Sequence, residues 1–163
     1  MKDQYSLSET VGRALQSRQL VLTTAESCTG GGISTAITDI AGSSDWFDRA
    51  FITYSNEAKM EMIDVQSKTL EGFGAVSEQT VTEMVAGALK YSNANVAIAV
   101  SGIAGPGGGS EEKPVGTVCF AWGDDAGWLQ VETQYFNGDR IAVRNQVIEH
   151  ALRVLYEHLC ATS

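Results

Sequence analysis

The stretch TAESCTGGG at residues 24–32 constrains the fold of this chain more than any other segment. A short apolar run at residues 20–22 precedes it, and apolar residues recur at helical spacing across residues 33–40. This order predicts a strand that passes through a small polar turn into a helix. The unpaired N–H groups at the start of such a helix can bind an anion or form an oxyanion hole beside a nucleophile. The segment is equally compatible with a capped helix whose glycines serve only close packing.

Patterns typical of strands and helices alternate along most of the chain. Helices are expected at residues 6–18, 31–40 and 57–63, after an N-cap at Ser77, and after Gly138-Asp139. Strands are expected at residues 20–25, 50–54, 95–100, 115–122 and 128–136. The last helix is expected to bury Ile141, Val147, Ile148, Leu152, Leu155 and Leu159.

This order predicts a three-layer α/β/α fold in a single domain that spans residues 1–163. The sheet is expected to be mixed and mostly parallel, with a C-terminal hairpin and a closing helix. The apolar run at residues 95–100 predicts a strand that is buried on both faces. Glycine-rich segments concentrate after the expected strands, which is where ligands bind in open α/β sheets.

Composition limits the partners and the compartment. The formal net charge of -9 gives the chain no general attraction for nucleic acids or anionic membranes. Three widely spaced cysteines, Cys28, Cys119 and Cys160, argue against a disulfide framework and for a reducing compartment. The polar N-terminus does not resemble a signal peptide, and no apolar run is long enough for a membrane helix. A soluble cytoplasmic protein is therefore expected.

The residue inventory argues against several mechanisms. The two histidines, His150 and His158, both fall on the last helix and are interpreted as helix-surface residues, which disfavours a Ser-His-Asp triad. Two histidines without paired cysteines also argue against zinc. The chain lacks a P-loop motif, and the glycine loop at residues 102–109 does not match the dinucleotide-binding pattern.

A serine activated by a lysine is one chemistry that the remaining polar residues permit. Ser27 lies in the turn after the first strand, and Lys59 lies one turn into a helix that starts at another strand end. Tyr54, at that strand end, can relay or donate a hydrogen bond. Lys59 taken alone is also compatible with a solvated lysine that pairs with Glu57 or Glu61. Cys28 is the rival nucleophile, although a cysteine at this position is more often packed as a small apolar residue.

The glycine loop and Arg140 suit a phosphate. Glycines let the backbone approach a ligand and form anion-binding nests. Arg140 lies near the first turn of the last helix, where the helix dipole prefers acids, so its position hints at an anionic partner. The alternatives are a mobile surface loop and an ordinary surface arginine.

Five segments occur in order: TAESCTGG at 24–31, YSNEAK at 54–59, SGIAGPGG at 101–108, KPVGTV at 113–118 and GDR at 138–140. Together they closely resemble the CinA C-terminal domain family, whose characterised activity is nicotinamide-nucleotide amidohydrolase. The resemblance covers residues 6–160, and the combined pattern is specific although each piece alone is not. The chain resembles the stand-alone form, without the molybdopterin-binding-like domain of longer CinA proteins.

The resemblance implies hydrolysis of the carboxamide of nicotinamide mononucleotide (NMN) to nicotinate mononucleotide and ammonia, as part of pyridine nucleotide recycling. It implies an α/β/α fold, a homodimer or higher homo-oligomer, and no metal or cofactor. It places the nucleophile on Ser27, the base on Lys59 and an assisting group on Tyr54. Backbone N–H groups of residues 28–31 are the expected oxyanion donors. The residues expected at the nucleotide substrate are Glu26, Thr29, Gly30, Gly31, Asn56, Ser101, Gly102, Gly105, Gly107, Gly108 and Arg140.

Two other functions remain open on the sequence alone. The same fold can act as a nucleotide-binding regulatory or partner-binding module without turnover. A cysteine-dependent amidase that uses Cys28 is the third possibility.

Overall fold

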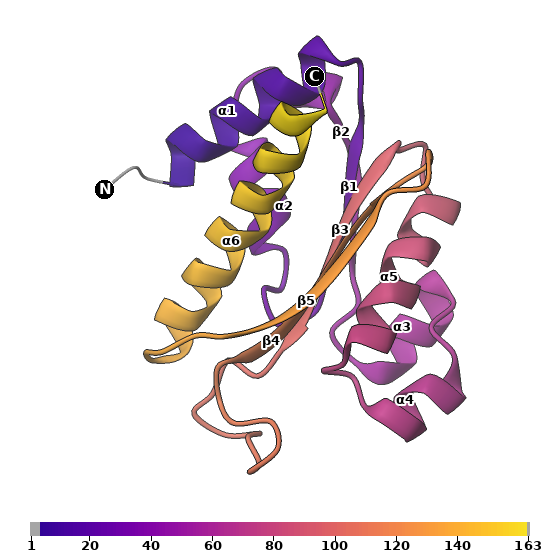
Figure 1. Ribbon diagram of the computed structural model, residues 1–163, viewed down its shortest axis with the longest axis vertical. Helices are drawn as coiled ribbons and strands as arrows, with labels where there is room; N and C mark the ends of the chain where they lie inside the picture. The colour runs from indigo at the N-terminus through magenta and orange to yellow at the C-terminus, as the bar shows by residue number, and fades with distance from the viewer. Residues whose placement is uncertain (1–3, 163) are drawn as a thin grey trace.

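One five-stranded sheet organises the chain in the computed structural model, which describes residues 4–162 (Figure 1). The strands are β1 (Leu22–Glu26), β2 (Phe47–Ile52), β3 (Val96–Gly102), β4 (Thr117–Asp124) and β5 (Leu129–Tyr135). Their spatial order is β2-β1-β3-β4-β5. The β2-β1-β3 part is parallel, and β4 and β5 continue it as an antiparallel hairpin. The predicted mixed sheet with a C-terminal hairpin is confirmed.

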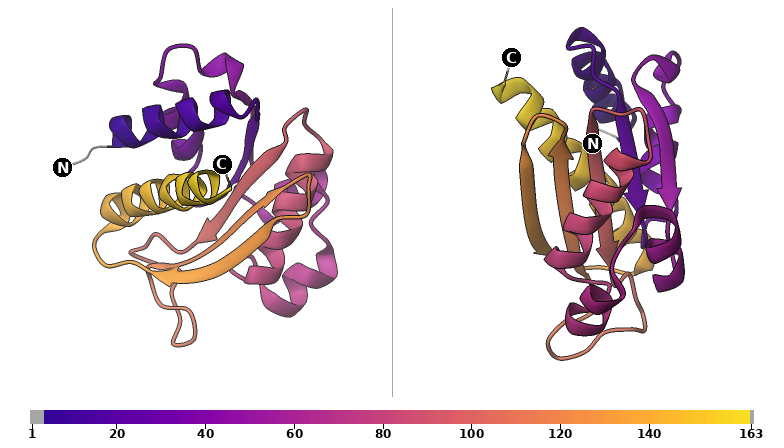
Figure 2. Two further views of the ribbon diagram at one scale, coloured as in Figure 1. Left: turned by 45° about the horizontal axis from the view of Figure 1, so that its top comes forward. Right: turned by 90° about the vertical axis from the view of Figure 1, so that its right-hand side faces the viewer.

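Helices cover both faces of this sheet (Figure 2). On one face lie α1 (Gln4–Ser17), α2 (Gly32–Thr38) and α6 (Arg140–Ala161), which contact one another. On the other face lie α3 (Asn56–Ile63), α4 (Ser67–Phe73) and α5 (Glu78–Lys90). A short 3-10 helix, Ser43–Asp45, precedes β2. The three-layer arrangement therefore matches the prediction, but α4 was not anticipated.

The central strand β3 contributes to two separate cores. Val96, Ile98 and Val100 join the core under α1, α2 and α6, while Ala97 and Ala99 join the core under α5. This alternation follows from the two-residue period of a strand, and it confirms the prediction that both faces are buried. The small side chains on the second face fit a strand that a helix approaches closely.

The last helix differs from its predicted core face at its first turn. Ile141 is 68% exposed, whereas Val143, two residues later, is fully buried. The other predicted core residues of this helix are buried. The prediction for Ile141 is wrong because helical packing against the sheet and α1 begins only at Val143. The first turn is instead occupied by the Asp139 cap, whose carboxylate accepts a hydrogen bond from the Ala142 N–H at 2.9 Å.

Candidate active site

A cavity of about 290 Å³ opens where the parallel strands β1, β2 and β3 end. Ser27 directly follows β1, Tyr54 follows β2, and Ser101 lies at the end of β3. Because these strands are parallel neighbours, their carboxyl ends bring residues far apart in sequence to one edge. The lining residues are Ser27, Cys28, Tyr54, Lys59, Ala75, Val76, Ser101, Gly102, Ile103, Ala104, Gly105, Gly107, Gly108 and Arg140.

Ser27 and Lys59 are hydrogen-bonded at the base of this cavity. Lys59 Nζ lies 2.9 Å from Ser27 Oγ, and it also donates to the backbone carbonyls of Thr53 at 2.8 Å and Tyr54 at 3.2 Å. The Ser27 N–H is fixed by the Val100 carbonyl at 3.1 Å. The two carbonyls occupy two positions around Nζ, so the third position faces the serine hydroxyl.

The environment of Lys59 favours its neutral form. The side chain is only 1% exposed, and burial lowers the lysine pKa to about 8. Its ammonium hydrogens meet carbonyl and hydroxyl oxygens, and Lys59 forms no ion pair within residues 4–162. The alternative of a solvated lysine paired with Glu57 or Glu61 is therefore wrong. A lysine that loses its proton near neutral pH can accept one from a serine.

Cys28 lies beside this pair but has the opposite character. The residue is 6% exposed, and burial raises the pKa of its thiol to about 11. A thiol with that pKa is almost entirely protonated at neutral pH, and the thiolate is the nucleophilic form. The hydrogen bond from Lys59 goes to Ser27, whereas burial keeps the Cys28 thiol in its protonated form.

Glu26 and Thr29, both predicted at the substrate, lie beneath the turn that holds Ser27 and do not line the cavity. The fully buried Glu26 carboxylate accepts hydrogen bonds from Thr24 Oγ1, Thr29 Oγ1 and the N–H groups of Ile33 and Ser34, at 2.7–3.0 Å. These contacts satisfy unpaired donors in the first turn of α2 and place a negative charge at its positive end. Glu26 therefore holds the turn in place from below.

Three other predicted contacts also lie outside the lining. Gly30 and Gly31 adopt positive φ angles of 58° and 102°, so they shape the tight turn into α2. Asn56 is exposed at the start of α3. Of the expected oxyanion donors, the Gly30 N–H donates to the Ser27 carbonyl at 3.0 Å, so the set reduces to Cys28, Thr29 and Gly31.

The glycine loop and Arg140 meet at the mouth of the cavity. Arg140 Nη1 donates to the Gly105 carbonyl at 2.8 Å, and Nη2 donates to the Tyr54 hydroxyl at 3.3 Å. Ser101, Gly102, Gly105, Gly107 and Gly108, which were expected at the substrate, all line the cavity. The first turn of α6 is thus tied to the loop after β3 and to the end of β2.

Arg144 contacts the turn after Ser27, and the sequence analysis did not single it out. It lies one turn after Arg140 on α6, and its guanidinium donates to the carbonyls of Cys28 and Thr29. The only available signal was the four-residue spacing of two arginines, which places both on one helix face. The sequence contained nothing to identify their backbone partners.

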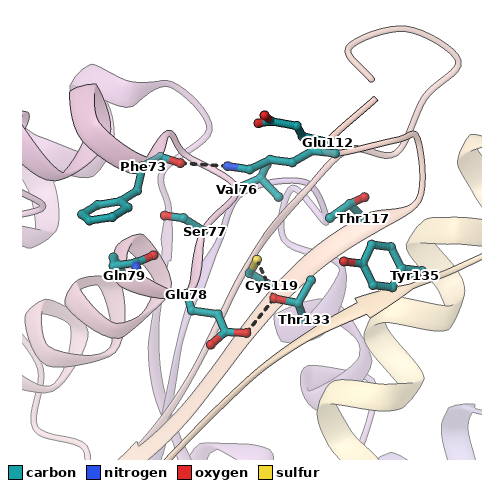
Figure 3. A pocket seen from close by; sticks show the side chains of 11 residues that line it. Phe73, Val76, Ser77, Glu78, Gln79, Glu112, Thr117, Cys119, Thr133 and Tyr135 are labelled. Atoms are coloured by element: carbon teal, nitrogen blue, oxygen red, sulfur yellow. Dashed lines mark hydrogen bonds between the residues drawn. The ribbon is translucent and has the colours of Figure 1, made fainter. Parts of the chain in front are cut away.

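A second cavity, of about 340 Å³, lies on the other side of Val76 and is shown in Figure 3. There the Thr133 hydroxyl donates to Glu78 at 2.7 Å and lies 3.4 Å from the Cys119 sulfur. Burial raises the pKa of the Cys119 thiol, and the Ser77 hydroxyl caps α5. Glu78, Thr133 and Ser77 are therefore engaged in structural hydrogen bonds, whereas the first cavity holds a serine beside a lysine.

The histidines lie outside the first cavity, but neither is a free surface side chain. His150 is partly buried, with its ring 4.8 Å from that of Phe120 and Nε2 2.8 Å from Glu132. His158 stacks on Trp128, with ring centroids 3.4 Å apart. The interpretation of both as helix-surface residues is wrong, since each is partly buried, and neither lines the cavity beside Ser27. Both rings pack between α6 and the β4–β5 hairpin.

Neither a metal site nor a membrane span emerges from the described chain. Within residues 4–162, no cluster of histidine, cysteine, aspartate and glutamate side chains could hold a metal ion. No helix in the same range is long and apolar enough to cross a membrane.

Comparison with known proteins gives one consistent family. The sequence model described as "CinA C-terminal domain" matches residues 4–159. "Nicotinamide-nucleotide amidohydrolase PncC" of Escherichia coli K12 is 57% identical over 151 residues, which cover 93% of this chain and 92% of that protein. The protein of the same name from Pseudomonas putida is 48% identical over 147 residues, 90% of this chain and 91% of that one. A "CinA-like protein" of Chloroherpeton thalassium is 45% identical, but the match spans only 38% of its length.

Solved structures have the same fold. The competence/damage inducible protein CihA of Agrobacterium tumefaciens superposes with a TM-score of 0.91 at 46% identity, covering 93% of each chain. A CinA superfamily protein of Klebsiella pneumoniae superposes with a TM-score of 0.94 at 41% identity, covering 98% of this chain and 99% of that one.

Proposed function

This chain belongs to the CinA C-terminal domain family, and we propose that it hydrolyses the carboxamide of NMN to nicotinate mononucleotide and ammonia. The observation that carries the proposal is the 2.9 Å contact between Lys59 Nζ and Ser27 Oγ inside a nucleotide-sized cavity. The substrate is inferred from the activity for which the Escherichia coli relative is named, and that relative is 57% identical along nearly the whole chain.

Ser27 is the proposed nucleophile and Lys59 the proposed base. When Lys59 is neutral, the Thr53 and Tyr54 carbonyls retain its two hydrogens and its lone pair faces the serine hydroxyl. Ser27 Oγ attacks the carboxamide carbon while its proton passes to Nζ. The ammonium then donates a proton to the leaving nitrogen, so that ammonia departs and an ester to Ser27 remains. Water, deprotonated by the same lysine, then attacks the ester carbon, and the bond to Ser27 Oγ breaks as the lysine ammonium returns the proton to that oxygen, which releases the carboxylate.

The oxyanion of each tetrahedral intermediate needs donors beside Ser27. Backbone N–H groups of Cys28, Thr29 and Gly31 are the candidates, since that of Gly30 is already bonded within the turn, and Cys28 is the one of the three that lines the cavity. Fixed N–H groups require little reorganisation as charge develops, which makes them effective in a partly dry cavity. Tyr54 assists from the mouth, where its hydroxyl accepts a hydrogen bond from Arg140 and keeps its own proton to donate.

The charge of the cavity favours an anionic substrate. The described lining residues include Lys59 and Arg140 but no aspartate or glutamate, although the whole chain carries a net charge of -9. Glycines 105, 107 and 108 allow close approach of a phosphate to the backbone, and Arg140 adds a guanidinium. This combination supports binding of the 5′-phosphate of a mononucleotide.

Ammonia release from NMN by the purified protein tests the proposal directly. We expect turnover by the wild type and loss of several orders of magnitude in kcat for Ser27→Ala, because a covalent route loses its nucleophile. The matched control is Cys28→Ala, which should retain most of the activity and lose about 1 kcal/mol of stability. The reverse ranking would move the nucleophile to Cys28.

A binding module without turnover is the competing function. It would bind NMN with equal affinity in the wild type and in Ser27→Ala, and neither protein would release ammonia. That result would overturn the proposed hydrolysis.

A further inference from the structure

We infer that Arg144 is a positioning residue that fixes the backbone of the turn after Ser27 for oxyanion binding. The inference rests on the proposed function for its link to catalysis, but the geometry stands independently. Arg144 Nε donates to the Cys28 carbonyl at 3.1 Å and Nη2 to the Thr29 carbonyl at 3.0 Å. One rigid guanidinium therefore bridges two consecutive peptide groups directly after the nucleophile.

These contacts determine where the N–H groups point. In a trans peptide the carbonyl and the following N–H point in opposite directions. Anchoring the Cys28 carbonyl on Arg144 therefore turns the Thr29 N–H away from the arginine. Within residues 4–162 that N–H has no protein acceptor, although Thr29 is fully buried. Thr29 does not line the cavity, whereas Cys28 does. By holding the Cys28 carbonyl, Arg144 fixes the backbone of Cys28 and so keeps the Cys28 N–H in place for an incoming oxyanion.

The second contact closes the turn. The Thr29 carbonyl accepts from both Arg144 and the Gly32 N–H, while the following Gly30 N–H donates to the Ser27 carbonyl at 3.0 Å. Gly30 has a φ of 58°, so this backbone has a left-handed geometry that only the closed turn maintains. From below, the Glu26 carboxylate holds the Ile33 and Ser34 N–H groups. Arg144 thus completes the support of the turn from the side of α6.

The charge of Arg144 is directed at these carbonyls. The guanidinium forms no ion pair within residues 4–162, and it is only partly exposed. A cation on a carbonyl oxygen strengthens the dipole of its peptide and so the donor power of the N–H at the other end. Arg140, one turn earlier, holds the glycine loop through Gly105. The two arginines therefore link both walls of the cavity to one helix.

The test compares Arg144→Met and Arg144→Lys with the wild type in NMN hydrolysis. We expect Arg144→Met to lower kcat by about 10- to 100-fold with KM changed by less than about threefold, since the effect falls on the transition state. Arg144→Lys keeps the charge but cannot bridge both carbonyls, so its kcat should lie between that of the wild type and that of Arg144→Met. Arg153→Met is the matched control because Arg153 lies on the same helix and, among residues 4–162, forms its ion pair with Glu149. It should leave both constants unchanged.

Amide hydrogen exchange gives a readout that does not require turnover. In Arg144→Met the Thr29 and Gly30 amides should exchange at least about tenfold faster, while amides in β3 and β4 keep their wild-type rates. Unchanged exchange at these two amides, or a rise in KM with kcat unchanged, would overturn the positioning role. Faster exchange throughout the protein would mean that Arg144 stabilises the whole fold and does not position this turn in particular, which would also overturn the inference. If the wild type releases no ammonia, the proposed function fails, and the exchange result still decides whether Arg144 fixes the turn.

Discussion

At the scale of single residues, the site depends on the protonation state of one lysine. Lys59 is buried, its pKa is lowered to about 8, and its three hydrogen-bond partners are all oxygens. A protonated Lys59 donates a hydrogen bond to all three, including the Ser27 hydroxyl, and therefore has no lone pair with which to accept the serine proton. Only the neutral form can remove the serine proton, so activity should follow the deprotonated fraction.

The pH profile of kcat/KM for NMN should therefore rise through an apparent pKa near 8 and level off above it. Lys59→Arg keeps a cation in the cavity but cannot deprotonate, so it should be nearly as inactive as Lys59→Met. Steady-state rates of ammonia release between pH 6 and 10, values chosen to bracket that pKa, would measure both effects. Substantial turnover by Lys59→Arg would exclude Lys59 as the base and make Tyr54 the next residue to test.

At the scale of elements, the first turn of α6 acts as part of the site and not as part of the core. Ile141 is exposed there, and Arg140 reaches across to Gly105 and Tyr54. This position explains why an arginine occupies a helix start, where the dipole disfavours a cation. Its guanidinium is held by a carbonyl and a hydroxyl, neither of which neutralises its charge, so it can still attract an anion.

Arg140→Met should raise KM for NMN much more than KM for nicotinamide riboside, which lacks the phosphate. Loss of a charge-assisted contact weakens binding by roughly 1.5–3 kcal/mol, or about 10- to 150-fold. The Arg153→Met protein again serves as the control for a lost arginine on the same helix. Equal losses on the two substrates would place Arg140 at the carboxamide or in a purely structural role.

At the scale of the whole molecule, the sequence predicted the architecture better than the partners of individual side chains. Strand ends and helix starts follow from local periodicity, so Ser27 and Lys59 could be placed near strand ends and Arg140 near a helix start from their positions alone. The structure then shows that all three line one cavity. The bonds from Arg144 to Cys28 and Thr29 join residues more than 100 positions apart, and only the packing of α6 beside α2 creates them.

Glu26 is a residue that the sequence placed at the substrate and the structure places in the interior. Its neighbours in sequence suggested a polar site residue, but it is the last residue of β1 and its carboxylate caps the next helix from within the core. A polar side chain at a strand end faces either the cavity or the interior, depending on the face of the sheet from which it projects. Because successive side chains project from opposite faces, a shift of one residue reverses this direction, and composition alone does not reveal it.

The buried lysine also makes global stability depend on pH. Its pKa is about 8 in the folded protein against 10.5 as its ordinary value. Below pH 8 the lysine is charged in both states, and burial of the ammonium destabilises the fold in full. As pH rises from 8 to 10.5, the folded state loses the proton first while the unfolded chain still binds it, so the free energy of unfolding increases. The gain is on the order of 3 kcal/mol at most.

Lys59→Met removes this titration while keeping a side chain of similar length. Relative to the variant, the wild type should become progressively more stable as pH rises from 8 to 10, because only the wild type relieves a buried charge there. Urea unfolding of both proteins at intervals across that range would measure the difference, and comparing the two cancels the other groups that titrate. A stability difference that stays constant with pH would mean that Lys59 does not titrate between those values, and the same result would remove the basis for its role as a base near neutral pH.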